Sequence, residues 1–393
     1  MGKQLNVIWT ATYQCNFACK YCYTDEEMSN KVDSVNLKMD LDLIELFFKK
    51  LATSSFSEFN FMFHGGEPLL LGLEYYREIV NFQKKYLKGE KYTNQFQTNG
   101  SLINYEVIRF LIENKFRVGI SIDGPKEIHD LYRVSKNGEG THDSILSNLR
   151  LLSEYNIPFG ALVVCNDLIA NSINETYSFF KSLKGLTTID FIAPHHSAIN
   201  NLAPNSFGNI LINFFDSWFN DPDVSFDIRI LSEMVIRLLG FPSSLCYFTE
   251  SCPTQAFTLS IVPDGNVYHC NRNMTYSLGN IKNDEIDYLM YKNPIRTRLS
   301  KINYKQIESC RFCEWFPFCH GGCPIYFDQM ANKSLYCLDF KNIFKHIYNT
   351  LERESILNNK TSLEICNTDL LINKVLKNRI KSFQGTKAKL DVI

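Results

Sequence analysis

The sequence is short of the features that most often place a protein at a membrane or on nucleic acid. It has no apolar run approaching the ~18 residues that a membrane span needs, and its N-terminal stretch, MGKQLNVIWTATYQC, lacks the apolar core of a secretory signal peptide. Neither sign of charge dominates, because Lys and Arg number 41 and Asp and Glu number 42. We therefore expect a soluble, cytoplasmic protein that binds neither nucleic acid nor a membrane.

The sequence also lacks a sign of export to an oxidising compartment where disulfides form, although cysteine is abundant. The chain has 13 cysteines, an odd number, and no secretory signal. Three lie at 15–22, three at 246–270 and five at 310–337, which leaves Cys165 and Cys366 alone. Cys165 ends an apolar segment and is predicted to be a small core residue. In a reducing compartment, cysteines clustered in this way usually bind metal.

Strand-like and helix-like segments alternate through the first half of the chain. Short segments rich in β-branched and aromatic residues predict strands at 6–12, 59–64, 94–98, 117–122, 159–165 and 188–193. Apolar residues recur at helical spacing over 41–52, 74–87, 105–115, 143–155 and 174–184. The alternation predicts an α/β fold with parallel strands, as an open sheet or a partial (β/α)6 TIM-like barrel. Both folds place chemistry at the carboxyl ends of the strands.

Polar and glycine-rich motifs follow five of the six predicted strands. Cys15 follows the first, and four motifs follow others: HGGEP at 64–68, QTNG at 97–100, SIDGP at 121–125 and APHH at 193–196. Because the carboxyl ends of parallel strands share one rim, these motifs are expected to converge there. HGGEP and SIDGP taken alone are also compatible with simple tight turns.

The spacing C-x3-C-x2-C at Cys15, Cys19 and Cys22 resembles the signature of the radical SAM superfamily, with aromatic Tyr21 just before the last cysteine. The resemblance implies a 4Fe–4S cluster in which three thiolates hold three irons. The fourth iron is then open to S-adenosylmethionine (SAM). An open metal position is typical of a catalytic site, whereas structural sites are closed. The alternatives are a zinc site or a chance spacing.

The same resemblance implies a set of residues that contact SAM. Gly65, Gly66 and Glu67 are similar to the family's GGE element, in which glycines admit the ligand and the carboxylate holds the SAM ammonium group. Ser121 is implied near the ribose and Arg133 near the SAM carboxylate. The remaining implied contacts are Tyr21, Asn99 and the backbone around Ile192.

A second cysteine array follows a predicted hairpin, FTLSIVPDGNVYHC, whose turn is Asp264-Gly265. The array resembles the SPASM domain, an auxiliary iron–sulfur module of many peptide-modifying radical SAM enzymes. The resemblance implies two further 4Fe–4S clusters. The family's crossed pattern assigns Cys246, Cys252, Cys270 and Cys323 to one, and Cys310, Cys313, Cys319 and Cys337 to the other. A pair of zinc sites is the alternative.

These resemblances divide the chain into three parts. Residues 1–225 are expected to form the radical SAM partial barrel. Residues 226–345 are expected to form the SPASM auxiliary domain, with a linker helix over 226–242 and the β-hairpin. Residues 346–393 are expected to form a C-terminal helix and a basic tail.

The resemblance also implies a reaction class. An electron from an external donor of flavodoxin or ferredoxin type cleaves SAM, and the resulting 5′-deoxyadenosyl radical takes a hydrogen atom from the substrate. One similar group, the anaerobic sulfatase-maturating enzymes, oxidises Ser or Cys to formylglycine. In that group an Asp directly follows the cysteine that closes the hairpin and serves as the base that accepts a proton. Here that position is Asn271, which cannot take a proton at neutral pH. That group also favours Gln where this chain has His64.

The first interpretation is therefore a maturase of a ribosomally made precursor peptide that forms a cyclophane, joining an aromatic carbon to a β-carbon. Sulfatase maturation, thioether or ether crosslinking and epimerisation are the enzymatic alternatives, and an iron–sulfur electron carrier is the non-enzymatic one. Crosslinking needs a base, and the candidates at the active rim are His64, His195 and His196, with Tyr23 lining the pocket. Each histidine is equally compatible with a structural hydrogen bond.

Overall fold

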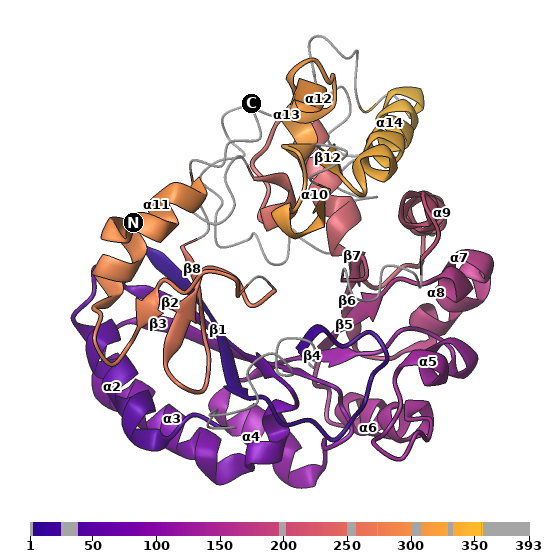
Figure 1. Ribbon diagram of the computed structural model, residues 1–393. Coiled ribbons are helices and arrows are strands. Elements are labelled where there is room, and N and C mark those ends of the chain that lie inside the picture. The colour runs from indigo at the N-terminus through magenta and orange to yellow at the C-terminus, as the bar shows by residue number, and fades with distance from the viewer. Residues whose placement is uncertain are drawn as a thin grey trace.

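The computed structural model describes residues 3–24, 38–195, 202–249, 257–272, 274–300, 308–328, 333–354 and 356. A curved sheet carries helices on its outer face (Figure 1). Four further helices lie together where this ring of strands and helices is open, namely α10 Arg229–Leu238, α12 Glu308–Arg311, α13 Phe316–Cys319 and α14 Cys337–Arg353. Within the described part of the chain, no helix is long and apolar enough to span a bilayer.

The main sheet has the strand order β10-β9-β8-β1-β2-β3-β4-β5-β6-β7. The strands are β1 Gln4–Thr12, β2 Glu58–Gly65, β3 Lys91–Thr98, β4 Arg117–Ser121, β5 Phe159–Val164, β6 Leu186–Ile192, β7 Asp227–Ile228, β8 Thr258–Ile261, β9 Asn266–Tyr268 and β10 Gly279–Asn280. All neighbouring pairs from β8 through β1 to β7 are parallel. The six predicted strands correspond to β1–β6, so the α/β partial barrel is confirmed.

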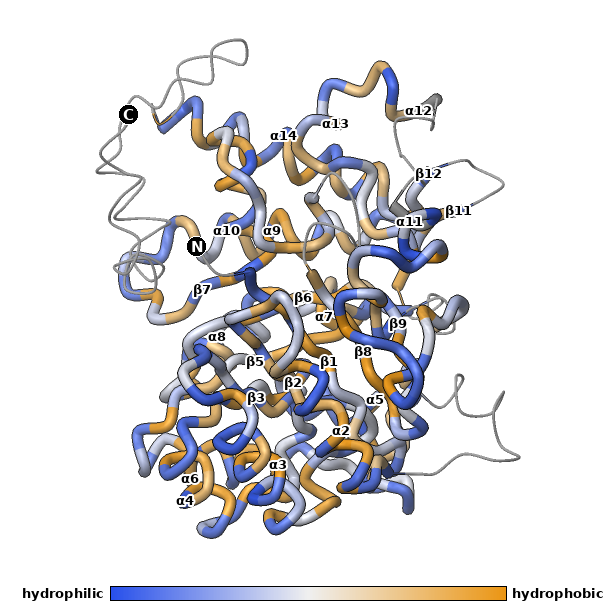
Figure 2. The backbone as a smooth tube through the Cα atoms, turned by 90° about the vertical axis from the view of Figure 1, so that its left-hand side faces the viewer, coloured by the Kyte–Doolittle hydropathy of each residue, from blue (hydrophilic) through white to orange (hydrophobic). Residues whose placement is uncertain are grey.

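Helices cover the outer face of this sheet in chain order. They are α2 Leu41–Ala52, α3 Leu73–Tyr86, α4 Tyr105–Asn114, α5 Lys126–Tyr132, α6 His142–Glu154, α7 Asp167–Asn171 and α8 Ile173–Ser182. In α2, the Asp40 side chain caps the helix by accepting a hydrogen bond from the Leu43 amide at 2.8 Å. The apolar face then packs on the strands, with the rings of Trp9 and Phe47 edge to face at 5.3 Å. Figure 2 shows apolar residues gathered along the strands in the middle of the molecule.

Helix α9, Ser206–Asn220, was not predicted from the sequence. It contacts α7 and α8 on one side and α14, Cys337–Arg353, on the other. Its buried residues recur at helical spacing, and Asn209, Asn213 and Asn220 are exposed on another face. The close approach to α14 needs a glycine, because a Cβ at Gly208 would lie 2.8 Å from the Cα of Asp339.

The predicted hairpin is formed by β8 and β9, which pair antiparallel. The sequence did not predict where it would lie. Strand β8 pairs in parallel with β1, from Asn6 opposite Thr258 to Trp9 opposite Ile261, so the hairpin extends the barrel sheet. At its turn Gly265 has φ +87°, a conformation that glycine adopts without strain.

The rest of the C-terminal region is built from short elements around one long helix. They are α10 Arg229–Leu238, α11 Pro294–Ser300, α12 Glu308–Arg311, α13 Phe316–Cys319, and the two-stranded sheet of β11 Phe327–Asp328 and β12 Lys333–Ser334. Helix α10 lies within the predicted linker helix, and α14 packs on both α9 and α10. The elements that carry the second cysteine array are thus packed against the barrel.

Candidate active site

The three N-terminal cysteines lie on a loop after β1, where their side chains are partly buried. The loop docks on the segment after α5, since the Ala18 amide donates to the Val134 carbonyl at 2.8 Å and the Lys20 amide to the Tyr132 carbonyl at 2.9 Å. The thiols of Cys15, Cys19 and Cys22 are close enough to interact electrostatically with one another. The three predicted ligands therefore share one loop, and no group of three or more His, Cys, Asp or Glu side chains in the described part of the chain is already arranged to hold a metal ion.

Burial dominates the ionisation of two of these thiols. Desolvation raises the pKa of Cys15 to about 11 and that of Cys19 to about 12, while the Arg133 guanidinium partly offsets the rise at Cys19. Both thiols are therefore protonated at neutral pH when no metal is bound. Loading of iron must release protons, which makes assembly of the site pH-dependent.

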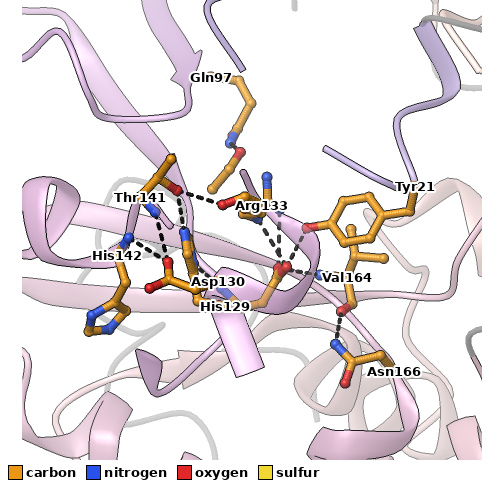
Figure 3. Close-up of polar contacts among 11 residues, drawn as sticks. Tyr21, Gln97, His129, Asp130, Arg133, Thr141, His142, Val164 and Asn166 are labelled. Atoms are coloured by element: carbon orange, nitrogen blue, oxygen red, sulfur yellow. Dashed lines mark hydrogen bonds and ion pairs between the residues drawn. The ribbon is translucent and has the colours of Figure 1, made fainter. Parts of the chain in front are cut away.

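Asp123 is the residue that organises this loop, and sequence reasoning missed it. Its side chain is fully buried and accepts hydrogen bonds from Arg133 Nε at 3.0 Å, Arg133 Nη2 at 3.1 Å and the Val164 amide at 3.0 Å. The Tyr21 hydroxyl also donates to it, and the Arg133 guanidinium lies 5.2 Å from the centre of the Tyr21 ring. In Figure 3 these groups converge on one carboxylate. The signal in the sequence was the acidic residue inside SIDGP, directly after an apolar strand.

One nitrogen of the Arg133 guanidinium is available to bind a ligand. Its Nε and Nη2 are bound to Asp123, whereas Nη1 has no hydrogen-bond partner among the described residues. Ser121, at the end of β4, accepts a hydrogen bond from Gln97 Nε2 at 3.2 Å. Ser121 therefore lies at the carboxyl end of β4, whereas Arg133 follows helix α5, where the cysteine loop docks.

The two glycines of HGGEP approach the chain just before Cys15. A Cβ at Gly65, which has φ +127°, would lie 2.4 Å from the Thr12 carbonyl oxygen, and one at Gly66 would lie 2.1 Å from that of Gln14. The Gly66 amide donates to the Thr12 carbonyl at 3.0 Å. These glycines allow the loop after β2 to fit against the base of the cysteine loop, a contact that the sequence did not reveal.

The Glu67 carboxylate connects the ends of neighbouring strands through hydrogen bonds. Its fully buried carboxylate accepts from the Leu69 amide at 3.0 Å, the Thr98 hydroxyl at 2.7 Å and the Asn99 amide at 2.8 Å. Burial raises its pKa to about 7, and these three hydrogen bonds oppose the rise. Asn99 in turn donates from Nδ2 to the Asn16 side chain at 2.9 Å. The geometry favours a positioning role for Glu67 over direct contact with SAM.

Replacement of Glu67 by Gln is expected to weaken SAM binding and to destabilise the fold by roughly 1–3 kcal/mol. The three groups that face the carboxylate are all donors, so the new amide N–H would find no acceptor. Chemical unfolding and equilibrium SAM binding measure the two effects. Glu74→Gln on exposed α3 is the matched control and should change neither; equal effects of both variants would contradict the positioning role.

Two of the catalytic candidates lie together. The rings of Tyr23 and His195 are 5.7 Å apart at an angle of 35°, and Asn271 Nδ2 donates to the Tyr23 hydroxyl oxygen at 2.8 Å. His195 follows β6 and Asn271 follows β9, so the cluster joins the barrel rim to the hairpin. His196 lies outside the described residues.

His64 is held as a neutral imidazole. Its Nδ1 accepts a hydrogen bond from the Gly65 amide at 2.6 Å, which places the ring proton on Nε2. Burial within the rim and the nearby Arg272 cation lower its pKa to about 4. The arrangement favours His64 as a hydrogen-bond donor and makes it a weak proton acceptor at neutral pH.

Two predicted residues serve the sheet itself. The Ile192 carbonyl accepts a hydrogen bond from the Cys165 amide at 2.9 Å, within the pairing of β5 and β6. Cys165 is fully buried, as the sequence predicted for a core residue. Cys366 and the basic tail lie outside the described residues.

The second cysteine array falls into two groups in space. Four cysteines line one pocket together with Phe340 and Lys341, and they are Cys310, Cys313, Cys319 and Cys337. Cys246, Cys270 and Cys323 interact electrostatically with one another at a different place. Cys252 lies outside the described residues, so the full assignment of ligands stays a prediction.

Two family models match this chain. Residues 9–180 match the radical SAM superfamily, and residues 252–314 match SPASM, an iron–sulfur cluster-binding domain. The cysteine-type anaerobic sulfatase-maturating enzyme of Clostridium novyi (strain NT) is 32% identical over 357 residues, which cover 86% of this chain and 94% of that relative. The serine-type anaerobic sulfatase-maturating enzyme of Bacteroides thetaiotaomicron is 27% identical, covering 89% of this chain and 91% of that relative.

Solved structures are similar over most of the chain. Native anSMEcpe with bound AdoMet (SAM) has a TM-score of 0.80 at 30% identity, covering 90% of this chain and 99% of that one. Streptococcus suis SuiB bound to precursor peptide SuiA has a TM-score of 0.59 at 14% identity, covering 85% of this chain and 74% of that one. The second is a likeness of fold alone.

Proposed function

Since this chain belongs to the radical SAM superfamily, as an enzyme that carries a SPASM domain and modifies peptides, we propose that it crosslinks two side chains of a precursor peptide. Its cofactors are 4Fe–4S clusters and SAM. The crosslink we propose is of cyclophane type, from an aromatic carbon to a β-carbon. An external one-electron donor of flavodoxin or ferredoxin type is part of the proposal.

The residues around the cysteine loop fit these cofactors. Cys15, Cys19 and Cys22 supply three thiolates, and the available Arg133 Nη1 lies beside the loop, positioned to bind a carboxylate. When bound, the cofactors supply a 5′-deoxyadenosyl radical that removes one hydrogen atom from the peptide. They also supply an acceptor for the electron that the peptide must lose. The protein residues must position the peptide, exclude water and accept the remaining proton.

We assign that proton transfer to the pair formed by His195 and Tyr23. His195 lies at the carboxyl end of β6 against the Tyr23 ring, on the side where the cysteine loop and the hairpin meet. Imidazole is suited to accept a proton near pH 7. His64 is less suited, because burial and Arg272 hold its pKa near 4.

The observation that carries the proposal is the amide of Asn271. Asn271 directly follows Cys270, at the position where the resemblance to sulfatase-maturating enzymes implies an Asp that serves as the base. Its Nδ2 donates to Tyr23, so the phenol oxygen accepts there and its own proton is directed elsewhere. A carboxylate at this position would accept the phenol proton and serve as a base. This difference in chemistry supports a product other than formylglycine.

Formylglycine formation is the second candidate function. It is favoured by the 32% identity to a cysteine-type sulfatase-maturating enzyme and by the TM-score of 0.80 to anSMEcpe. Under this candidate, Tyr23 and His195 would have to replace the missing carboxylate as the base for a Ser or Cys side chain.

One experiment separates the two candidates. The enzyme is produced without oxygen together with the short peptide encoded nearest to its own gene, and in parallel is incubated with a synthetic sulfatase-site peptide containing Cys or Ser. Tandem mass spectrometry is expected to show loss of two hydrogen atoms from the first peptide, with fragmentation blocked across an aromatic-containing segment. An aldehyde on Ser or Cys that a carbonyl reagent traps would overturn the crosslink. An unchanged mass that gains deuterium in heavy water would also overturn it, in favour of epimerisation.

The variant Asn271→Asp sharpens the comparison. The carboxylate would accept the Tyr23 hydroxyl proton and reorient it, so the crosslink yield is expected to fall about tenfold, equivalent to about 1.4 kcal/mol. The formylglycine candidate predicts the opposite, a gain of aldehyde on the sulfatase-site peptide. Asn283→Asp, at an exposed position just after β10, is the control that should alter neither product.

A further inference from the structure

Arg272 lies between the barrel rim and the cysteine group formed by Cys246, Cys270 and Cys323. It follows Cys270 by two residues and donates from Nη1 to the Tyr247 hydroxyl at 3.2 Å. Its Nη2 donates to the Tyr326 hydroxyl and to the Ala193 carbonyl at 3.5 Å, at the end of β6. The guanidinium also lies 5.3 Å from the centre of the Tyr326 ring. The side chain therefore connects the auxiliary region to the carboxyl ends of the barrel strands.

What sets Arg272 apart is its lack of an acidic partner. By contrast, the buried guanidinium of Arg133 is matched by the carboxylate of Asp123. Across the described ranges of the chain, no carboxylate oxygen lies within 4 Å of Arg272; its partners are phenols and a backbone carbonyl. A guanidinium removed from water without an anion is costly, so its charge must be balanced by another negative group.

The auxiliary thiols beside Arg272 become negative when they hold a cluster. The Arg272 amide donates to Cys270 Sγ at 3.4 Å. Its guanidinium interacts electrostatically with both Cys246 and Cys323. All three cysteines belong to the group that the crossed pattern assigns to one cluster. A cluster held by thiolates is anionic, so it would provide the charge that the neighbouring side chains of Arg272 do not.

We propose that Arg272 is a positioning residue that acts as the fixed counter-charge of the auxiliary cluster held by Cys246, Cys270 and Cys323, and raises its reduction potential. One-electron reduction adds a single negative charge to a cluster and neither forms nor breaks a bond. A fixed cation inside the protein therefore stabilises the reduced form more than the oxidised form. Hydrogen bonds to the cysteine sulfurs act in the same direction, and Arg272 supplies one through its backbone.

The same cation also faces the active rim. The Arg272 guanidinium interacts electrostatically with His64. It also donates a hydrogen bond to the carbonyl of Ala193, two residues before His195. The cluster that receives an electron from the peptide would thus be the auxiliary cluster nearest the reacting side chains. This inference rests on the iron–sulfur cofactors of the proposed function but not on which product is formed.

The test measures cluster potentials, which a merely structural role would not move. The full chain with Cys15, Cys19 and Cys22 replaced by Ala retains only the auxiliary clusters. In this background, electron paramagnetic resonance at controlled potential gives the midpoint of each cluster for Arg272→Met, Arg272→Lys and the parent. Lys341→Met is the matched control, because Lys341 lines the pocket of the other four cysteines.

Arg272→Met is expected to shift one auxiliary midpoint to more negative potential, whereas Arg272→Lys restores most of the parent value. Lys341→Met should leave that midpoint unchanged. If Arg272→Met loses the cluster's iron and Arg272→Lys keeps it, the charge is again the cause and the proposal stands. Unchanged midpoints in both Arg272 variants, or equal loss of iron from both, would overturn it. None of these readings needs a peptide, so they are independent of the product assignment.

Discussion

Replacement of Cys19 by Ala is expected to abolish cleavage of SAM while leaving the auxiliary clusters in place. Cys19 is one of three thiols on a single loop, and no fourth cysteine lies nearby in sequence to substitute for it. The variant should contain about four iron atoms fewer per chain than the parent. SAM cleavage should fall by more than the 10–100-fold typical of groups that only support metal ligands. Iron analysis and the release of 5′-deoxyadenosine measure the two effects.

Cys165→Ala provides the matched control. Cys165 is fully buried in the hydrophobic core and belongs to neither cysteine array. Its replacement should cost roughly 1 kcal/mol of stability and leave iron content and SAM cleavage at parent levels. Full iron content and cleavage in Cys19→Ala would show that the loop does not hold the catalytic cluster.

Replacement of Asp123 by Asn is expected to have the largest effect of any change outside the cysteines. It leaves the buried Arg133 guanidinium without its anion and disturbs the hydrogen bond that Tyr21 makes at the cysteine loop. Removing one partner of a buried ion pair typically costs 3–5 kcal/mol. The Arg133 Nη1 donor would also lose its fixed direction, so SAM affinity should fall together with stability. Thermal unfolding and equilibrium binding of SAM report the two quantities.

A double variant separates the two effects of Asp123. Adding Arg133→Met to Asp123→Asn removes the unpaired charge, so most of the stability should return while SAM affinity stays low. Asp130→Asn on the same helix α5 is the control. Asp130 accepts only backbone amides, from Thr141 and His142, and its replacement should leave SAM binding unchanged. Recovery of SAM affinity in the double variant would contradict the assignment of Arg133.

Local patterns were sufficient to predict the barrel strands and the cysteine loop. Strands β1–β6 are short apolar segments between helices with one apolar face, and each pattern is set by neighbours in sequence. Helix α9 was not predicted, although its buried residues recur at helical spacing and Asn209, Asn213 and Asn220 are exposed, so the pattern was present in the sequence. The C-x3-C-x2-C spacing was readable because all three ligands share one loop.

Residues that act through partners distant in the sequence could not be predicted. Asp123 gains its role from Tyr21, which lies 102 positions away, and Arg272 from Tyr326, 54 positions away. Glu67 was predicted from its motif, but three donors hold its carboxylate at the strand ends. A motif therefore identified the place, whereas only the packing identified which atoms each side chain touches.

The pairing of β8 with β1 has a consequence for synthesis on the ribosome. β1 is among the first segments to emerge, yet the strand that covers one of its edges begins at Thr258. The nascent chain must therefore expose a parallel edge until about two thirds of the protein has been made. Unpaired edges of this kind invite association with other chains. Late closure by the hairpin would tie completion of the sheet to arrival of the cysteine-rich region, so that a prematurely terminated chain would leave one edge of its first strand unpaired.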